Sequence, residues 1–257
     1  HSFSYELITI GFMLLGALNF NLHYQFWNGN FKELYKDTEI KTFFLSITFL
    51  FFFIALGLCF SKIYPKTILL FRKGFYQFIS AHTGTGYSTI YSSRLVKEWS
   101  DFSKFLLIIA MAFGGGVCST TGAIKMLRIA IFFKTLKEYI KRIMLSEKIL
   151  VMEKIHHLKD LILEDKQINL VFLIILTYIT IYLAGALVGV FYGYPFLDSL
   201  FESISATANV GLSSGITKTT MPMGLKFVYI FQMWAGRLEF MAIFTLFGFL
   251  VSIFKGK

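Results

Sequence analysis

Uncharged stretches long enough to cross a lipid bilayer recur along the chain. A helix needs roughly 20 residues to span the hydrocarbon core of a membrane. Five stretches approach or exceed this length: 7–22, 42–60, 105–124, 169–191 and 227–254. The first is uncharged over 16 residues and can be extended by its flanks, whereas the last contains Arg237 and Glu239. The pattern predicts an all-α membrane protein with five membrane helices.

Two shorter helical segments, 74–81 and 195–206, cannot span a membrane alone. Each lies between two predicted spans and precedes a stretch rich in Gly, Ser and Thr. This order is typical of a re-entrant half-helix followed by extended backbone. Such backbone is tolerated at membrane depth only where protein or a water-filled cavity covers it. We therefore expect two re-entrant half-helices in addition to the five spans.

The loops that follow the two half-helices form an internal repeat. Residues 79–89 (ISAHTGTGYST) align without a gap on residues 204–214 (ISATANVGLSS), and five of the eleven positions are identical. The unit of helix, half-helix, glycine-centred loop and helix therefore occurs twice. Two spans separate the copies, so both loops enter the membrane from the same side, unlike inverted-topology repeats.

Loops of this composition can bind a dehydrated monovalent cation. Backbone carbonyls supply oxygen ligands in the selectivity filters of potassium channels, and glycine reaches the unusual backbone angles that such loops need. The C-terminal ends of both half-helices add partial negative charge, and neither loop contains a carboxylate. One such loop is more often a simple turn, but two matched copies favour a filter. The predicted filter residues, which would bind potassium, are Thr83, Gly84, Thr85, Gly86, Tyr87, Ala208, Asn209, Val210, Gly211 and Leu212.

Five motifs together resemble those of the Trk/Ktr/HKT superfamily of potassium transporters, and the TrkH type most closely. The resemblance covers nearly the whole chain, and the order of the motifs makes it specific. The motifs are LGALNFNLH at 15–23, TGTGY at 83–87, FGGGVCSTTGAIK at 113–125, NVG at 209–211 and GRLE at 236–239.

The resemblance implies a pore built from four repeats, of which this chain holds the later part. Residues 1–41 would be the last helix of the second repeat and a loop, and 42–131 the third repeat, with its filter at 83–87 and a broken helix at 105–131. Residues 132–168 would be a basic cytoplasmic connector, and 169–257 the fourth repeat with its filter at 208–212. Two loops cannot ring such a pore. Either the N-terminal half is missing, which the absent initiator Met favours, or another chain supplies it.

Composition and charge narrow the alternatives. Apolar residues make up 56% of the chain and charged residues 16%, against about 25% charged in soluble domains, which excludes a disordered chain and an ordinary soluble enzyme. The net charge of +10 suggests lipid headgroups rather than nucleic acid as the partner. Residues 125–167 hold ten Lys and Arg, which predicts a cytoplasmic location and places both filter loops outside. Lys62, Lys66, Arg72 and Lys73 then fall on the outer side.

A run of small residues and one cation near mid-membrane are the candidate gate. Seven helix-weakening residues within nine positions predict a break in the third span, although close helix packing is the alternative. The resemblance makes this break an intramembrane loop below the filter, with Arg237 beside it. A charge at mid-membrane is usually functional, although a structural ion pair is the alternative. Glu239 should point to another face. The predicted gate residues are Gly114, Gly115, Gly116, Ser119, Thr120, Thr121, Gly122 and Arg237.

The histidines and the connector receive simpler interpretations. His82 departs from the family pattern, and we favour packing behind the filter loop over a role in an outer ion site. Residues 132–165 read as a cytoplasmic helix. The adjacent His156 and His157 would face different ways on it and make a poor metal site, so we interpret them as exposed histidines. The resemblance implies that this helix docks a cytosolic nucleotide-binding regulatory subunit of the TrkA/KtrA type, and that the protein is a homodimer.

The sequence thus predicts a multi-pass plasma-membrane protein that takes up potassium through a carbonyl-lined filter, gated by an intramembrane loop, without an organic cofactor. A sodium/potassium symporter or sodium-permeable transporter of the same fold is one alternative, and a non-conducting scaffold or fragment is another. We expect no enzyme, because Arg237 and Glu239 are the only charges within the predicted spans and no nucleophile–base or metal-ligand spacing accompanies them.

Overall fold

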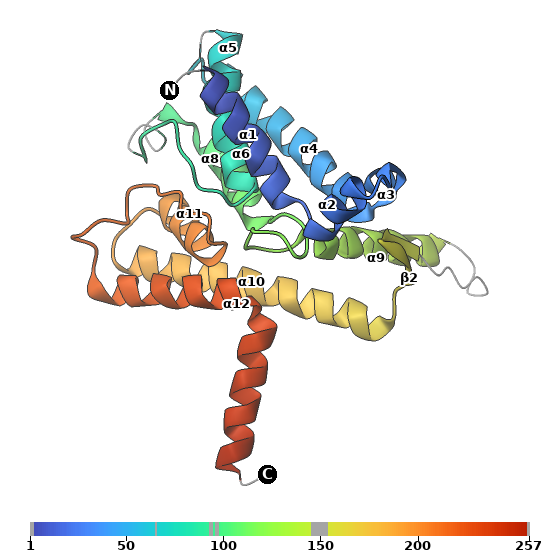
Figure 1. The fold of residues 1–257 in the computed structure, drawn as a ribbon. Helices are drawn as coiled ribbons and strands as arrows, with labels where there is room; N and C mark the ends of the chain where they lie inside the picture. The colour runs from blue at the N-terminus through green and yellow to red at the C-terminus, as the bar shows by residue number, and fades with distance from the viewer. Residues whose placement is uncertain (1–2, 65, 93–94, 96–97, 145–153, 256–257) are drawn as a thin grey trace.

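The computed structural model describes residues 3–64, 66–92, 95, 98–144 and 154–255 as a bundle of helices with one short hairpin (Figure 1). The remaining positions, including residues 145–153 of the predicted connector and Lys257, lie outside the described residues. The elements in chain order are α1 (Phe3–Ala17), α2 (Phe20–Trp27), α3 (Phe31–Lys36), α4 (Thr38–Phe60), α5 (Thr67–Leu69), the π-helical η1 (Leu70–Phe75), α6 (Tyr76–His82), α8 (Asp101–Ala112), α9 (Met126–Met144), β1 (Lys154–His157), β2 (Lys159–Ile162), α10 (Asp165–Phe191), α11 (Phe196–Thr207) and α12 (Met223–Phe254).

Within the described residues, α4, α10 and α12 are long and apolar enough to cross a membrane. The pair α1 and α2 qualifies as a fourth span only if its 103° bend is included. The bend arises because the Asn19 side chain accepts a hydrogen bond from Asn21 N and so starts a new helix. By length and composition, three or four of the described elements are therefore candidate spans, against the five predicted from the sequence. The stretch 105–124 is not one helix, since α8 ends at Ala112 and α9 begins at Met126.

The last predicted span is also not straight. Glu239 has φ 58° and ψ 141°, which lie outside the helical region, and the chain changes direction there. Figure 1 shows the terminal part of α12 projecting away from the rest of the bundle. The side chain of Glu239 forms an ion pair with Arg128 of α9, so the bend is held by a contact between residues far apart in sequence.

The connector contains a β-hairpin that the sequence interpretation missed. Strands β1 and β2 pair antiparallel, with Ile155 opposite Leu161 and His157 opposite Lys159. Leu158, at φ 58°, occupies the turn. Ile155 is buried in a small cluster with Ile131 of α9 and Val171 of α10. The helix predicted over 132–165 is therefore wrong for 154–162, where β1 and β2 pair as a hairpin instead.

The two short helices at the predicted half-helix positions form the centre of the packing. All seven residues of α6 are buried, and α11 lies against α8, α10 and α12. The largest fully buried side chains include Phe78 of α6, Phe201 of α11 and Tyr178 of α10. Large apolar side chains on the long helices face outward instead, such as Phe52 and Phe247. An apolar exterior of this kind fits a lipid environment.

Small residues allow α10 to approach α11 closely. Gly185 packs against the side chains of Ser203 on α11 and Gln232 on α12. The amide nitrogen of Gln232 donates hydrogen bonds to Ile181 O (2.8 Å) and to Ser203 Oγ (3.0 Å). A Cβ atom at position 185 would overlap the Gln232 amide. Close helix contact through small and polar residues is the common packing mode in membranes.

Replacing Gly185 by Val should therefore destabilise the bundle by about 1–3 kcal/mol, the usual cost of overpacking. We expect a lower midpoint of thermal unfolding for the detergent-solubilised protein. Gly11→Val is the matched control, because Gly11 is also a helix residue but has no atom within 4 Å of an added Cβ. Equal midpoints for both variants would contradict this packing account.

Candidate functional site

The loops after α6 and α11 use the same backbone hydrogen bonds at equivalent positions. Thr85 N donates to Ser80 O (3.0 Å), and Val210 N donates to Ser205 O (2.9 Å). Each donor lies 125 residues from its counterpart, as does each acceptor. The sequence repeat is therefore also a repeat of backbone geometry.

Left-handed backbone angles fall at the same two positions in both loops. Gly86 and Gly211, the aligned glycines, have φ of 78° and 88°. Gly84 has φ 64°, and its counterpart Asn209 has φ 56°. Asn is one of the few non-glycine residues that adopts this conformation readily. Alternation of ordinary and left-handed residues turns successive carbonyl groups in directions that a helix does not allow.

The two loops are in direct contact. A Cβ atom on Gly86 would overlap the carbonyl oxygen of Val210. Gly211 has no atom within 4 Å of an added Cβ and is exposed. Tyr87 is also exposed. The structure therefore places both sets of predicted filter residues side by side, with part of each loop open.

A polar brace supports each loop from behind. Ser88 Oγ donates to Gln77 Oε1 (3.0 Å), and Ser213 Oγ donates to Glu202 Oε1 at the equivalent positions. Glu202 is buried and also accepts a hydrogen bond from Ser214 N (2.9 Å). The sequence interpretation did not identify these braces. Gln77 and Glu202 are 125 residues apart, which is the offset of the sequence repeat, so the alignment could have revealed these hydrogen bonds.

The segment from 113 to 125 leaves the helical conformation, as its small residues predict, and the protein satisfies its backbone groups. Gly114 N donates to Ile124 O (2.9 Å), and Gly115 N donates to Thr121 Oγ1 (2.8 Å). Gly116 N donates to Ala17 O at the end of α1 (2.7 Å).

Side chains complete this network. Ser119 Oγ donates to Gly116 O (2.6 Å), and Thr120 Oγ1 donates to Gly16 O (3.0 Å). Such partners are what irregular backbone at membrane depth requires.

This segment, residues 113–125 (hereafter the intramembrane segment), lies against both predicted filter loops. A Cβ atom on Gly122 would overlap the carbonyl oxygen of Ala208. A Cβ atom on Gly84 would lie 3.7 Å from Thr121 Cβ. The predicted filter and gate residues are therefore one connected unit. A groove of about 360 Å³ opens beside them along α1, lined in part by Thr85, Tyr87 and Thr120.

Two cationic side chains donate hydrogen bonds to carbonyl groups of this segment, one from α12 and one from the end of the segment itself. Arg237 Nη1 donates to Thr120 O (3.1 Å), and Lys125 Nζ donates to Thr121 O. Arg237 is exposed, whereas Lys125 is buried. Glu239 points elsewhere and pairs with Arg128, so the expectation that Arg237 and Glu239 face different ways is confirmed. The sequence interpretation assigned no role to Lys125, which the structure places within the network.

His82 packs behind the first filter loop. It is fully buried, its ring stacks on Phe43 and Phe78, and its ring nitrogens lie 2.9 Å from Ser46 Oγ and 3.0 Å from Ala110 O. These contacts fix α6 between α4 and α8. The packing interpretation of His82 is the one that agrees with the structure.

Several known proteins are similar to this chain. An uncharacterized cation transporter of Methanocaldococcus jannaschii is 29% identical over 252 residues, which is 96% of this chain and 49% of that protein. The Trk system potassium uptake protein TrkH of Escherichia coli is 24% identical, covering 92% of this chain and 48% of its own length. The chain thus spans about half the length of the curated relatives it matches.

A solved structure shares the fold. The crystal structure of the potassium transporter TrkH from Vibrio parahaemolyticus superposes with a TM-score of 0.81 at 25% identity, covering 95% of this chain and 52% of that one. The profile of the TrkH family, described as "Cation transport protein", matches residues 63–252. The family is one of membrane transport proteins, not of enzymes, and the resemblance drawn from the sequence motifs is confirmed. This chain belongs to the TrkH family of cation transport proteins.

Proposed function

We propose that this chain forms half of a potassium-selective uptake pathway, in which potassium passes the carbonyl groups of residues 83–87 and 208–212. The observation that carries the proposal is the repeated geometry of two loops in mutual contact. Left-handed residues recur at the same positions of both loops, at Gly84 and Asn209 and again at Gly86 and Gly211.

The chemistry follows from the loss of water. A potassium ion that enters a narrow pore must replace its water ligands with oxygen atoms, and backbone carbonyls provide them without a formal charge. The C-terminal ends of α6 and α11 lead directly into the loops, so their partial negative charges favour a cation there. The brace of Ser213 on Glu202 would keep the second loop from collapsing when no ion is bound.

The complete pore requires two more loops. We place residues 42–131 and 169–257 as the third and fourth of four similar repeats, with 1–41 as the end of the second. The first two repeats would come from a preceding part of a longer chain or from a second chain. The open side of the filter loops, where Tyr87 and Gly211 are exposed, supports a partner at this face.

The intramembrane segment would act as the gate. It lies against both loops through Gly122 and Thr121. Arg237 donates a hydrogen bond to its backbone at Thr120 O. A fixed positive charge beside the ion path raises the energy of a passing cation. Movement of the segment would displace Arg237 together with the obstructing backbone, so conduction and gating would be coupled.

The assembly and location follow the same proposal. The protein would be a homodimer in the plasma membrane, with the basic connector on the cytoplasmic side. The exposed side chains of α9, which include Lys137 and Tyr139, would meet lipid headgroups or a cytosolic nucleotide-binding regulatory subunit.

The direct test of function is ion flux in liposomes that contain the purified complete transporter. We expect uptake of potassium or rubidium along its gradient, and competition by sodium only at much higher concentration. Equal flux of sodium and potassium would favour the sodium-permeable alternative. Absence of flux from a correctly folded protein would contradict the proposal.

Gly211→Ser should reduce the preference for potassium over sodium by roughly tenfold, equivalent to about 1.4 kcal/mol. A side chain at φ 88° strains the loop and misplaces its carbonyl groups. Gly193→Ser is the matched control, since Gly193 has φ 87° and equally open surroundings in a turn between α10 and α11. Gly86→Ser should have a larger effect, because its side chain would also meet the backbone carbonyl oxygen of Val210 in the other loop. Ion competition assays that show no change in either filter variant would rule out these loops as the filter.

Arg237→Ala should raise the rate of rubidium uptake by up to about tenfold, because a barrier lowered by about 1.4 kcal/mol gives that factor. Lys134→Ala serves as the control. Lys134 also donates to a backbone carbonyl, Lys154 O (3.1 Å), but it lies on α9 beside the hairpin and, among the described residues, has no hydrogen bond to the loops or to residues 113–125. An Arg237 variant that is expressed normally with unchanged flux would show that this charge does not limit conduction.

A further inference from the structure

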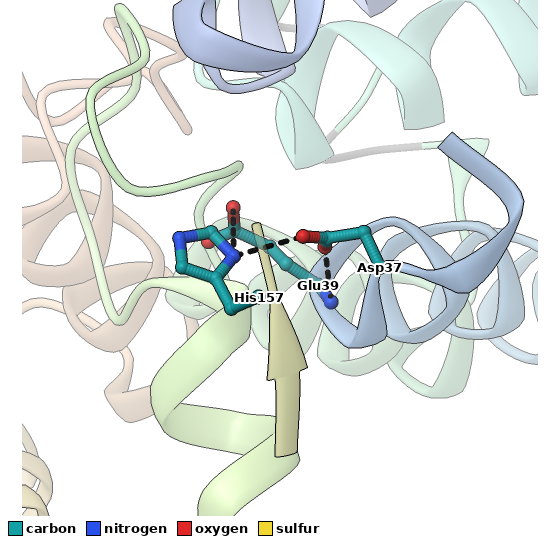
Figure 2. A group of neighbouring side chains, drawn as sticks. All are labelled: Asp37, Glu39 and His157. Carbon is teal, nitrogen blue, oxygen red and sulfur yellow. Dashed lines mark hydrogen bonds and ion pairs between the residues drawn. The ribbon is translucent and has the colours of Figure 1, made fainter. Parts of the chain in front are cut away.

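Three titratable side chains meet where α3, α4 and the hairpin come together (Figure 2). Asp37 caps the N-terminus of α4, Glu39 lies in its first turn, and His157 ends β1. One ligand atom from each residue lies within 4.8 Å of the other two. His157 Nδ1 lies 3.0 Å from Asp37 Oδ2 and 3.9 Å from Glu39 Oε2. The expectation that His157 is an exposed histidine is wrong, because it lies on a strand that turns it inward.

We propose that Asp37, Glu39 and His157 bind a divalent transition-metal ion that fastens the hairpin to the start of α4 and to the intramembrane segment. The site is separate from the predicted filter loops, and it joins Asp37 and Glu39 to a histidine 120 residues from Asp37.

Each carboxylate is already oriented for such a role. Asp37 Oδ1 accepts hydrogen bonds from Glu39 N (2.8 Å) and Ile40 N (3.2 Å), which leaves Oδ2 to face His157. Glu39 Oε1 accepts a hydrogen bond from Val117 N (2.7 Å), which leaves Oε2 to face the same point. Backbone contacts of this kind orient the ligands of metal sites and fix their geometry.

One oxygen atom of the cluster lacks a hydrogen bond. Glu39 is only 2% exposed, and its Oε2 atom makes no hydrogen bond of good geometry among the described residues, although the Asn19 side chain is a polar neighbour of the same carboxylate. A buried carboxylate oxygen without a partner is costly, and most buried polar atoms in proteins are paired. A cation placed between the three side chains would satisfy this atom.

The donor set favours a transition metal over magnesium or calcium. An imidazole nitrogen with two carboxylate oxygens suits zinc, iron, cobalt or manganese, whereas magnesium and calcium prefer oxygen alone. Ligand bonds of about 2.0–2.1 Å in a tetrahedral zinc site place the ligand atoms roughly 3.3 Å apart. The separations of 3.0 and 3.9 Å from His157 are close to that value. Water would complete the coordination.

The proposed metal site lies between the connector and the intramembrane segment. Glu39 accepts a hydrogen bond from the backbone N–H of Val117, which belongs to the intramembrane segment 113–125. His157 belongs to the hairpin of the connector. A bound ion would therefore join the connector to the segment that lies against the filter loops. In this way the ion would couple movements of the connector to the segment.

Calorimetric titration of the complete, detergent-solubilised protein with zinc tests the proposal without measuring transport. The protein is first freed of metal with a chelator and studied at about pH 8, because metal binding needs a neutral imidazole and the hydrogen bond that His157 donates to Asp37 raises the pKa of His157. We expect one saturable zinc site per chain, and no competition from an equal concentration of magnesium.

Variants identify the ligands. His157→Ala and Glu39→Gln should each weaken zinc binding by at least roughly 100-fold, because loss of a ligand exceeds the effect of disturbing an outer partner. Glu39→Gln keeps the shape of the side chain and the acceptor for Val117 N, so it guards against misfolding as the cause. His156→Ala is the matched control. His156 is the neighbouring histidine, but it contacts Glu33 and Asp160 instead.

The outcomes separate clearly. Zinc binding that survives in His156→Ala and is lost in both ligand variants supports the proposal. Absence of a saturable zinc site, retention of the site in either ligand variant, or equal loss in His156→Ala overturns it. None of these results depends on ion flux, so failure here leaves the proposed potassium pathway untouched.

Discussion

The whole structure depends on one constraint, which is that backbone groups that leave a helix within a membrane need partners inside the protein. Residues 83–87, 113–125 and 208–212 all leave helical hydrogen bonding. The carbonyl groups of Ser80 and Ser205 accept the hydrogen bonds of the two filter loops, while Gly16 and Ala17 accept those of the intramembrane segment. Buried short helices and small residues follow from this need, because only they bring backbone close enough to backbone.

Close approach also explains why the predicted filter and gate residues form one connected unit. Gly122 lies against the carbonyl of Ala208, and Gly236 lies against that of Thr207. Neither position has room for a side chain without movement of backbone atoms. Gly236 and Arg237 are neighbours on α12. The packing of Gly236 against Thr207 of α11 therefore also positions Arg237 for its hydrogen bond to Thr120 O in the intramembrane segment. A displacement of α12 would reach the filter loop and the segment together.

The sequence predicts local features well and long-range contacts poorly. Hydrophobic runs locate α4, α10 and α12, and the repeated glycine positions locate the left-handed residues Gly86 and Gly211. The break at Glu239 was missed because it is held by the distant Arg128, and the β-hairpin because Ile155 packs against α9 and α10. The bend at Asn19 is capped locally by Asn21 N, but it lies within an uncharged run that indicates a single span. The approach of His157 to Asp37, 120 residues away, has no counterpart in local pattern.

The central claim is that the two loops line one ion path, and anomalous X-ray scattering from crystals of the complete transporter grown with rubidium or thallium tests it most directly. We predict ion density beside the carbonyl groups of residues 83–87 and 208–212, with ligand oxygens from both loops, and its loss when sodium replaces the heavier ion. Ordered ion density confined to side chains elsewhere, with none between the two loops, would contradict the claim.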